Sequence, residues 1–157
     1  VEYDHRGVIG IMEAMCLDLD INSEDVVGNQ SPIYYGMSTM NIFNSICAQA
    51  KLVLIPKVLF ATPVPLLEYI LEKQISYVMW VPNIFATSAQ FKAWEGLEEG
   101  LKCLKKLLFA GEVMPTKQIN KWRQALPHIR YFPGYGSTEY FDSVLLLIVL
   151  YILLLIL

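Results

Sequence analysis

The stretch from Gly134 to Glu139, Gly-Tyr-Gly-Ser-Thr-Glu, combines residue types that a nucleotide site needs. Its glycines, Gly134 and Gly136, let the backbone approach a ligand closely and adopt positive φ. Ser137 and Thr138 offer hydroxyl donors to an oxyanion such as phosphate, Glu139 offers a hard oxygen ligand for Mg²⁺, and Tyr135 offers a flat face on which a base can stack. The same composition is typical of an ordinary strand-to-helix turn. The residues alone therefore leave both interpretations open.

Strands and helices alternate along the chain that leads to this stretch. Apolar periodicity predicts helices over residues 6–19, 40–50, 63–71, 83–94 and 116–126, and apolar or β-branched runs predict strands over 52–55, 75–81, 107–110 and 129–132. This order predicts an α/β fold with a Rossmann-like parallel sheet and helices on both faces. Ligands of such sheets bind outside the carboxyl ends of the strands. The turn Gly111-Glu112 and the stretch Gly134–Glu139 both leave predicted strands there.

Some of these elements carry more detailed expectations. The strand over 52–55 is expected to be buried on both faces. Thr62 is expected to cap the third helix, with Pro63 at its first position. Residues 20–31 are polar and rich in turn formers apart from Val26-Val27, so a loop is expected there. The helix over 40–50 is expected to pack through an apolar face that contains Ile42, Phe43, Ile46 and Cys47.

Charge and cysteine content exclude several classes of protein. Twelve basic and fifteen acidic residues give a net charge of −3, which argues against a nucleic-acid binder. The one tight basic cluster is Lys102, Lys105 and Lys106, and a solvated edge beside a strand explains it better than a phosphate patch. The three cysteines are odd in number and lack metal-type spacing, which predicts neither a disulfide framework nor a zinc site. Buried, reduced thiols in a cytoplasmic protein are expected for Cys16, Cys47 and Cys103.

The two ends of the chain are unusual. The first residues lack an initiator methionine and the pattern of a signal peptide, so the chain is expected to begin within a longer protein. Residues 144–157 form an uncharged apolar tail of 14 residues, whereas a membrane-spanning helix needs about 20. A truncated or frame-shifted end, a partial membrane anchor and an extension into the core all remain open for this tail. We expect residues 1–143 to form the folded unit and expect no membrane association.

The Gly134–Glu139 stretch resembles the fifth core motif of adenylate-forming (AMP-binding) enzymes, Tyr-Gly-Pro-Thr-Glu. Other segments resemble the same family in the same order, and the resemblance covers about residues 1–143. It is closest to D-alanine–carrier-protein ligases and to the amino-acid adenylation domains of peptide synthetases, and it implies part of the N-terminal core domain of such an enzyme. The segments are Val1–Arg6, Asp25–Pro32, Pro56-Lys57, Leu66–Ile70, Trp80–Pro82, Leu107–Pro115 and Trp122–Pro127.

This resemblance implies a reaction and a set of roles. ATP and a carboxylic or amino acid would give an acyl-adenylate and pyrophosphate, and the acyl group would pass to the phosphopantetheine thiol of a carrier protein. Thr138 would contact the α-phosphate, Glu139 would hold Mg²⁺, and both would be catalytic. The implied nucleotide-binding residues are Gly111, Glu112, Gly134, Tyr135, Gly136, Ser137 and Thr138. The implied substrate pocket contains Tyr35, Gly36, Trp80 and Pro82.

Three departures from the family pattern modify this expectation. Gly36 stands where amino-acid-activating members have an aspartate that pairs with the substrate ammonium. The pair Pro133-Gly134 stands where the family has asparagine and one further residue before Tyr-Gly, and Ser137 replaces a proline. The phosphate loop with its lysine, the ribose-binding aspartate and the lid domain with its catalytic lysine are not among these 157 residues. The isolated chain is therefore expected to be inactive. An acyl-CoA or aryl-acid ligase fragment and a degenerate, non-catalytic remnant that at most binds a nucleotide or a partner stay open as alternatives.

Overall fold

The computed structural model describes residues 2, 4–134 and 136. It confirms the alternation of strands and helices predicted from the sequence. The elements in chain order are α1 (His5–Asp18), β1 (Val26–Asn29), α2 (Gly36–Cys47), β2 (Lys51–Leu54), the 3₁₀ turn η1 (Lys57–Ala61), α3 (Pro63–Glu72), β3 (Tyr77–Trp80), α4 (Pro82–Gln90), the 3₁₀ turn η2 (Gly100–Cys103), β4 (Lys106–Phe109), α5 (Thr116–Ala125) and β5 (Arg130–Pro133).

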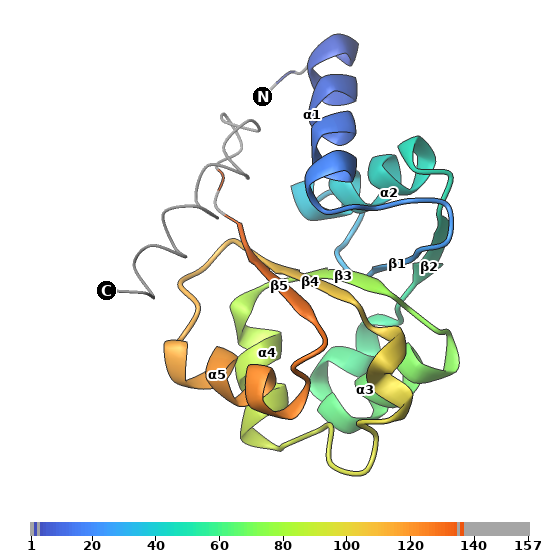
Figure 1. Ribbon diagram of the computed structural model, residues 1–157. Coiled ribbons are helices and arrows are strands. Elements are labelled where there is room, and N and C mark those ends of the chain that lie inside the picture. Colours follow the sequence, from blue (N-terminus) through green and yellow to red (C-terminus); the bar gives the residue numbers. More distant parts are fainter. Residues whose placement is uncertain (1, 3, 135, 137–157) are drawn as a thin grey trace.

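The described strands form one parallel sheet in the order β2-β1-β3-β4-β5 (Figure 1). Three of the four strand pairs are aligned over four residues each, as in Lys106↔Arg130 to Phe109↔Pro133. The β1–β3 pair is shorter and aligns only Val27 with Tyr77 and Gly28 with Val78. The strand order reverses between these two strands, since β1 leads to β2 on one side and β2 leads to β3 on the other. In open parallel sheets, such a switch point is where ligands bind.

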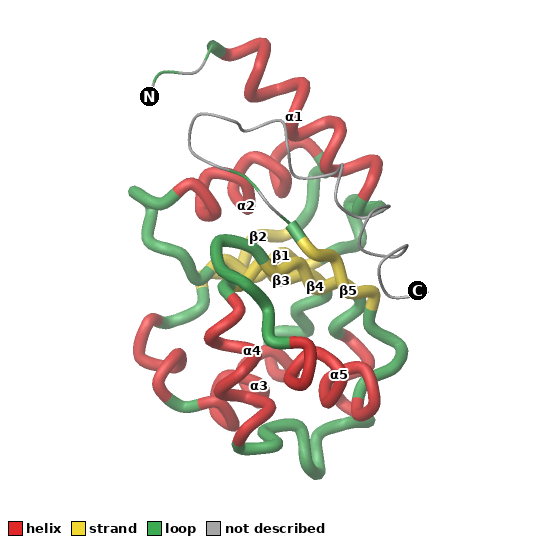
Figure 2. The backbone as a smooth tube through the Cα atoms, turned by 90° about the vertical axis from the view of Figure 1, so that its left-hand side faces the viewer, coloured by secondary structure: helices red, strands yellow, loops and turns green. Residues whose placement is uncertain are grey.

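Helices cover both faces of the sheet, as expected. Figures 1 and 2 show α1 and α2 on one face and α3, α4 and α5 on the other. Side chains alternate along β3 accordingly: Tyr77 and Met79 belong to the cluster beneath α1 and α2, whereas Val78 and Trp80 belong to the cluster beneath α3–α5. The two clusters give the domain a core on each side of the sheet.

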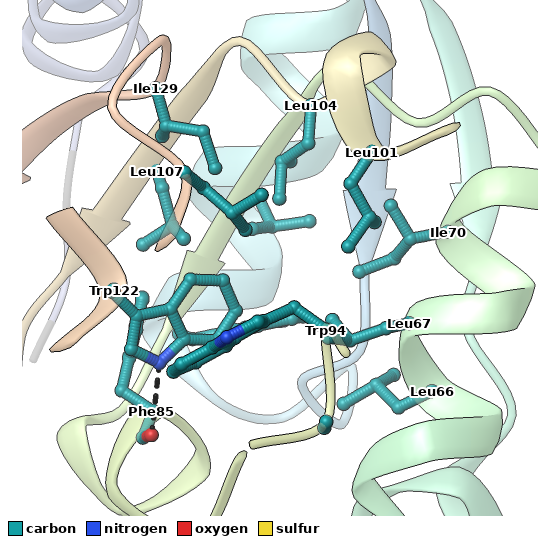
Figure 3. Close-up of a cluster of buried hydrophobic side chains, with 14 of the residues drawn as sticks. Leu66, Leu67, Ile70, Phe85, Trp94, Leu101, Leu104, Leu107, Trp122 and Ile129 are labelled. Carbon is teal, nitrogen blue, oxygen red and sulfur yellow. Dashed lines mark hydrogen bonds between the residues drawn. The ribbon is translucent and has the colours of Figure 1, made fainter. Parts of the chain in front are cut away.

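The α3–α5 side is built around aromatic rings. Trp122 packs edge-to-face on Trp94 at a centroid distance of 5.0 Å and on Phe85 at 5.4 Å. Its Nε1 donates a hydrogen bond to the Phe85 carbonyl at 3.1 Å (Figure 3). The ring centroid of Trp80 lies 5.4 Å from that of Phe85 and 6.5 Å from that of Trp122. Such pairs contribute about 0.5–1.5 kcal/mol each beyond area burial. This cluster anchors β3, whose carboxyl end contributes to the candidate site.

Helix α2 turns the opposite face to the sheet from the one that the sequence predicts. Phe43, Ile46 and Cys47 are exposed, and the predicted apolar face is therefore wrong. The inner face combines methionines with polar residues, and it consists of Met37, Ser38, Met40, Asn41, Asn44 and Ser45. Tertiary hydrogen bonding makes this possible, because Asn41 Nδ2 donates to Asn29 Oδ1 at 3.0 Å. Cys47 is exposed, and Cys16 and Cys103 are only half-buried, which corrects the expectation that all three thiols are buried.

Strand β1 lies within the segment for which the sequence predicts a loop. It is short, and it contains Gly28, which strands disfavour. The glycine is required by packing, because a Cβ there would lie 2.9 Å from Ile75 Cγ2 and 3.1 Å from Ile55 Cδ1. Because β1 is interior, the neighbouring β2 is an edge strand. Its Lys51 and Leu54 are exposed, which corrects the prediction of burial on both faces.

Two further side chains differ from expectation. Thr62 does not cap α3; its Oγ1 donates back to the Leu59 carbonyl at 3.2 Å, although Pro63 begins the helix as predicted. Lys102 and Lys105 are exposed, but Lys106 is buried and pairs with Asp25. The basic cluster is therefore divided between solvent and core. Lys106 begins β4, and its alternating position turns it toward the α1–β1 connection.

Candidate functional site

The two glycine turns predicted to form the nucleotide side lie next to each other. Gly134 follows β5, and its N–H donates to the Phe109 carbonyl of β4 at 2.8 Å. A Cβ on Gly134 would lie 3.2 Å from Leu108 Cδ2 and 3.3 Å from Ala110 Cβ, so the strands approach closely here. Gly111 begins the turn after β4 with φ +93°, a conformation that side chains rarely adopt. The stretch that begins at Gly134 therefore leaves the sheet beside Gly111-Glu112.

Tyr35 extends from the segment before α2 to the same turn. Its hydroxyl oxygen lies 3.6 Å from the point that a Cβ on Gly111 would occupy. Met37 Cε and Val81 Cγ1 each lie 3.8 Å from that point. Segments that follow β1, β3 and β4 thus converge on Gly111, at the carboxyl edge of the sheet. Of the predicted pocket residues, Tyr35 is brought to the predicted nucleotide turn.

Gly36 begins α2 without a positive φ. A Cβ built on it meets no heavy atom of the described residues within 4 Å. Neither backbone conformation nor crowding thus requires glycine at this position. Glu112, the residue after Gly111, is exposed. Gly136 is also exposed.

Trp80 and Pro82 are both buried, and neither is among the side chains that approach Gly111 as Tyr35 does. The Trp80 side chain is fully buried against Phe85 and Trp122 on the α3–α5 side of the sheet. Pro82 begins α4. The residue between them, Val81, is the one that approaches Gly111. Neither Val81 nor Met37 is among the site residues predicted from the sequence, although side-chain alternation along the strand indicates that residues 80 and 81 face opposite ways.

A buried polar link supports the segment that carries Tyr35. Asn41 Nδ2 donates to Asn29 Oδ1, and Asn29 Nδ2 donates to the Ser31 carbonyl at 3.3 Å. Asn29, Ser31 and Asn41 are all buried. These bonds fasten the carboxyl end of β1 to α2, so they hold the intervening loop in place. Sequence reasoning missed this link because the two asparagines belong to different elements.

The other predicted site residues, Tyr135, Ser137, Thr138 and Glu139, lie outside the described residues, and so does the apolar tail 144–157. Their roles remain predictions. Across the described part of the chain, no group of three or more His, Cys, Asp or Glu side chains is placed to hold a metal ion. No helix in that part is long and apolar enough to cross a membrane.

Comparison with known proteins identifies a family. A family model described as AMP-binding enzyme matches residues 1–147. An L-proline–[L-prolyl-carrier protein] ligase of Pseudomonas fluorescens is 24% identical over 139 residues, which is 88% of this chain and 28% of the relative. A D-alanine–D-alanyl carrier protein ligase of Bacillus cereus is 29% identical over 122 residues, covering 78% of this chain and 24% of the relative. The chain thus spans about a quarter of the length of these two curated relatives.

Solved structures share the fold. IdnL1 superimposes with a TM-score of 0.80 at 23% identity, over 88% of this chain and 28% of that protein. The Vibrio cholerae adenylation domain AlmE, in complex with glycyl-adenosine-5'-phosphate, superimposes with a TM-score of 0.76 at 21% identity, over 90% of this chain and 25% of that one.

Proposed function

Because this chain belongs to the AMP-binding enzyme family, we propose that it forms part of an ATP-dependent ligase that activates a carboxylic or amino acid as an acyl-adenylate. The acyl group then passes to the phosphopantetheine thiol of a carrier protein. Relatives named as ligases of L-prolyl and D-alanyl carrier proteins support this acceptor. The proposal concerns a longer protein, of which these residues supply one part of the site.

The observation that carries the proposal is the convergence on Gly111. The turn after β4 and the start of Gly134–Glu139 are joined by the 2.8 Å bond from Gly134 N to Phe109 O. Tyr35 reaches the same turn from the segment before α2. Gly111, with its positive φ, adds no side chain of its own at this edge, which favours a close approach of a ligand group to its backbone. The carboxyl edge is where a parallel sheet binds ligands.

The proposed reaction has two steps. A carboxylate oxygen attacks the α-phosphorus of ATP, the bond to the β-phosphate oxygen breaks, and acyl-adenylate and pyrophosphate form. The carrier thiol then loses its proton to solvent, its sulfur attacks the acyl carbon, the bond from that carbon to the phosphate oxygen breaks, and AMP leaves. Thr138 donates its hydroxyl to the α-phosphate, and Tyr135 stacks on the adenine. Glu139 supplies a carboxylate oxygen for Mg²⁺, which when bound neutralises phosphate charge.

A second substrate class is favoured by Gly36. An ammonium group taken out of water needs a charged or hydrogen-bonding partner, and Gly36 supplies none. This lack of an ammonium partner suits an aryl acid or another acid without an α-amine, as in an aryl-acid or acyl-CoA ligase, and no described heavy atom would lie within 4 Å of a Cβ on Gly36. We propose this as the alternative to amino-acid activation.

Catalysis by the 157 residues alone is not expected. They lack a Ser/Thr/Gly-rich phosphate loop and the downstream lysine that the family resemblance implies. ATP–pyrophosphate exchange by the isolated polypeptide should therefore stay at background, and clear turnover would contradict this proposal. The degenerate, non-catalytic remnant stays as the competing interpretation of the chain.

Calorimetric titration with ATP and Mg²⁺ tests the site without requiring turnover. We expect the wild-type chain to release heat, Glu139→Ala to lose most of it, and Glu98→Ala to match wild type. Glu98 is a suitable control because it is an exposed carboxylate in the loop before β4, at the opposite edge of the sheet. Equal heats for wild type and Glu139→Ala would remove Glu139 as the metal ligand. An absence of heat from the folded wild type would favour the remnant.

A further inference from the structure

The side of α2 that points away from the sheet is apolar. Ile42, Phe43 and Ile46 recur at the three- and four-residue spacing of one helix face. Phe43 is 42% exposed and Ile46 is 62% exposed, and Cys47 next to Ile46 is exposed as well. None of the twelve residues of α2 is charged. The described residues thus leave an apolar, uncharged surface open, and we call it the α2 outer face (Ile42, Phe43, Ile46 and Cys47).

Hydrogen bonds on the other side of α2 prevent this surface from turning inward. Asn41 Nδ2 donates to Asn29 Oδ1 of β1 at 3.0 Å, and Asn44 Nδ2 lies 3.9 Å from Met15 Sδ of α1. Both asparagines are fully buried. Rotation of the helix to bury Phe43 and Ile46 would bring these amides into solvent and break the bond to β1. The exposure of the α2 outer face is therefore fixed by the packing of the opposite face.

The helices on the other side of the sheet have a different outer surface. Figures 1 and 2 show α3, α4 and α5 there, across the sheet from α2. Glu68 and Glu72 are exposed on α3. The exposed positions of α5 are all polar, and they are Thr116, Lys117, Asn120 and Gln124. Polar and charged side chains are typical of a helix face in water. The chain thus has one layer suited to solvent and one helix suited to burial.

We propose that the α2 outer face is an internal interface of the longer enzyme, where it packs against an apolar, uncharged surface of another part of the same polypeptide. The inference rests on the proposed function for the existence of that longer polypeptide. Two carrier-protein ligases similar to this chain are matched over only 28% and 24% of their length, so most of each lies outside the matched region. Depletion of charge is typical of the buried centre of an interface.

The size of the α2 outer face favours a partner in the same polypeptide over a second copy of the chain. Twelve helical residues form a strip about 18 Å long and about 10 Å wide. A stable complex of separate proteins buries roughly 800 Å² on each partner, which is several times the area of this strip. Two parts of one polypeptide avoid most of the entropy cost of association, so a smaller contact is sufficient between them.

Alkylation of Cys47 tests the interface without a substitution, because this thiol lies in the α2 outer face. The native longer polypeptide and the native 157-residue chain are treated briefly with iodoacetamide and then cleaved after glutamate. The peptide 25–68 contains Cys47 as its one cysteine, and the peptide 100–112 contains Cys103 on the other side of the sheet as a reference. We expect the Cys47-to-Cys103 labelling ratio to be lower in the longer polypeptide by about tenfold or more, because a covered thiol reacts only while the contact is open.

A charge in the α2 outer face provides a second measurement. Ile46→Lys should lower the melting temperature of the longer polypeptide and leave that of the 157-residue chain unchanged, because only the longer polypeptide would bury the new charge. Phe91→Lys is the matched control, since Phe91 is 64% exposed at the end of α4. It should change neither melting temperature.

Three results would overturn the interface. They are equal labelling ratios in the two proteins, equal tolerance of Ile46→Lys, and labelling of Cys47 in the 157-residue chain that slows as its concentration rises, which would identify a second copy as the partner. ATP–pyrophosphate exchange by the longer polypeptide reports on the proposed function separately. Exchange with an unprotected Cys47 would overturn the interface alone, whereas a protected Cys47 without exchange would support the interface and count against the function.

Discussion

Lys106 and Asp25 form a buried ion pair that ties β4 to β1 at the amino edge of the sheet. The Nζ–Oδ2 distance is 2.6 Å, and the side chains are only 6% and 3% exposed. Ser76, just before β3, donates its hydroxyl to the other carboxylate oxygen at 2.7 Å, and Lys106 also donates to the Asp20 carbonyl. The backbone N–H of Asn22 completes the set at 3.0 Å. These additional hydrogen bonds compensate for the loss of hydration of the two buried charges.

Removal of the lysine should destabilise the domain strongly. Lys106→Met leaves the Asp25 carboxylate buried without its cation, which typically costs about 3–5 kcal/mol. Lys102→Met is the matched control, because Lys102 is exposed and surface substitutions usually stay within about 0.5 kcal/mol. Urea unfolding followed by circular dichroism measures both free energies. Similar midpoints for the two variants would show that the pair contributes little.

Stability should fall in acid through the same carboxylate. Burial alone raises the pKa of Asp25, but hydrogen bonds from Lys106, Ser76 and the Asn22 N–H, together with the lysine charge, outweigh burial and bring this pKa below its usual 3.8. The unfolded chain therefore binds the proton more tightly. The stabilisation is fully present above about pH 4 and is lost as pH falls through the lower, folded-state pKa. Urea unfolding between pH 7 and pH 2.5 should show this loss in wild type, and Lys106→Met should show a smaller slope.

Adding one methyl group at two different glycines should have opposite effects. Gly28→Ala places a Cβ 2.9 Å from Ile75 Cγ2 and 3.1 Å from Val78 Cγ1 in the core. Overpacking of this kind costs roughly 1–3 kcal/mol. Gly10→Ala, within α1, meets nothing within 4 Å and should stabilise by about 0.5–1 kcal/mol through helix propensity. Thermal unfolding of the two variants measures both effects as shifts in melting temperature relative to wild type. An unchanged melting temperature for Gly28→Ala would mean that Ile75 and Val78 repack freely.

A carboxylate at residue 36 should be tolerated and should change ligand preference. Gly36→Asp introduces a negative charge at the first residue of α2, which stabilises by about 0.3–1 kcal/mol through the helix dipole. A charged hydrogen bond to an ammonium contributes about 1.5–3 kcal/mol, so amino-acid binding should strengthen roughly tenfold or more. Gly36→Asn controls for side-chain size. Calorimetry with an amino acid and an aryl acid measures the preference, and equal gains for both ligands would contradict this assignment of the pocket.

The sequence predicted best those elements that carry strong local signals. Helices α3 and α5 and strand β3 have clear apolar patterns, and prolines mark their boundaries. The sequence does not predict strand β1, because Asp25 just before it and Asn29 at its end are polar residues whose burial depends on partners elsewhere in the chain. The inner face of α2 and the burial of Lys106 depend on tertiary contacts of the same kind.

The candidate site was predictable to a similar extent. The parallel-sheet rule placed Gly111 and Gly134 at one edge, and the family resemblance pointed to Tyr35. The choice between Trp80 and Val81 could not be made, because it depends on which face each residue of β3 presents. A shift of one residue along a strand reverses that face, and the sequence does not fix the end of the strand that closely.

The short β1–β3 pairing makes the sheet mechanically uneven. Few backbone hydrogen bonds hold strands β2 and β1 to the block formed by β3, β4 and β5. Only Val27 and Gly28 of β1 are aligned with β3, at Tyr77 and Val78. Next to them, the Val26 N–H donates to the Ser76 hydroxyl. Force or partial denaturation should open the sheet along this seam first. The approach of Tyr35 to Gly111 spans it at one edge, and the Lys106–Asp25 pair spans it at the other. Separation of the two blocks would therefore take the candidate site apart while leaving each block's own strands paired.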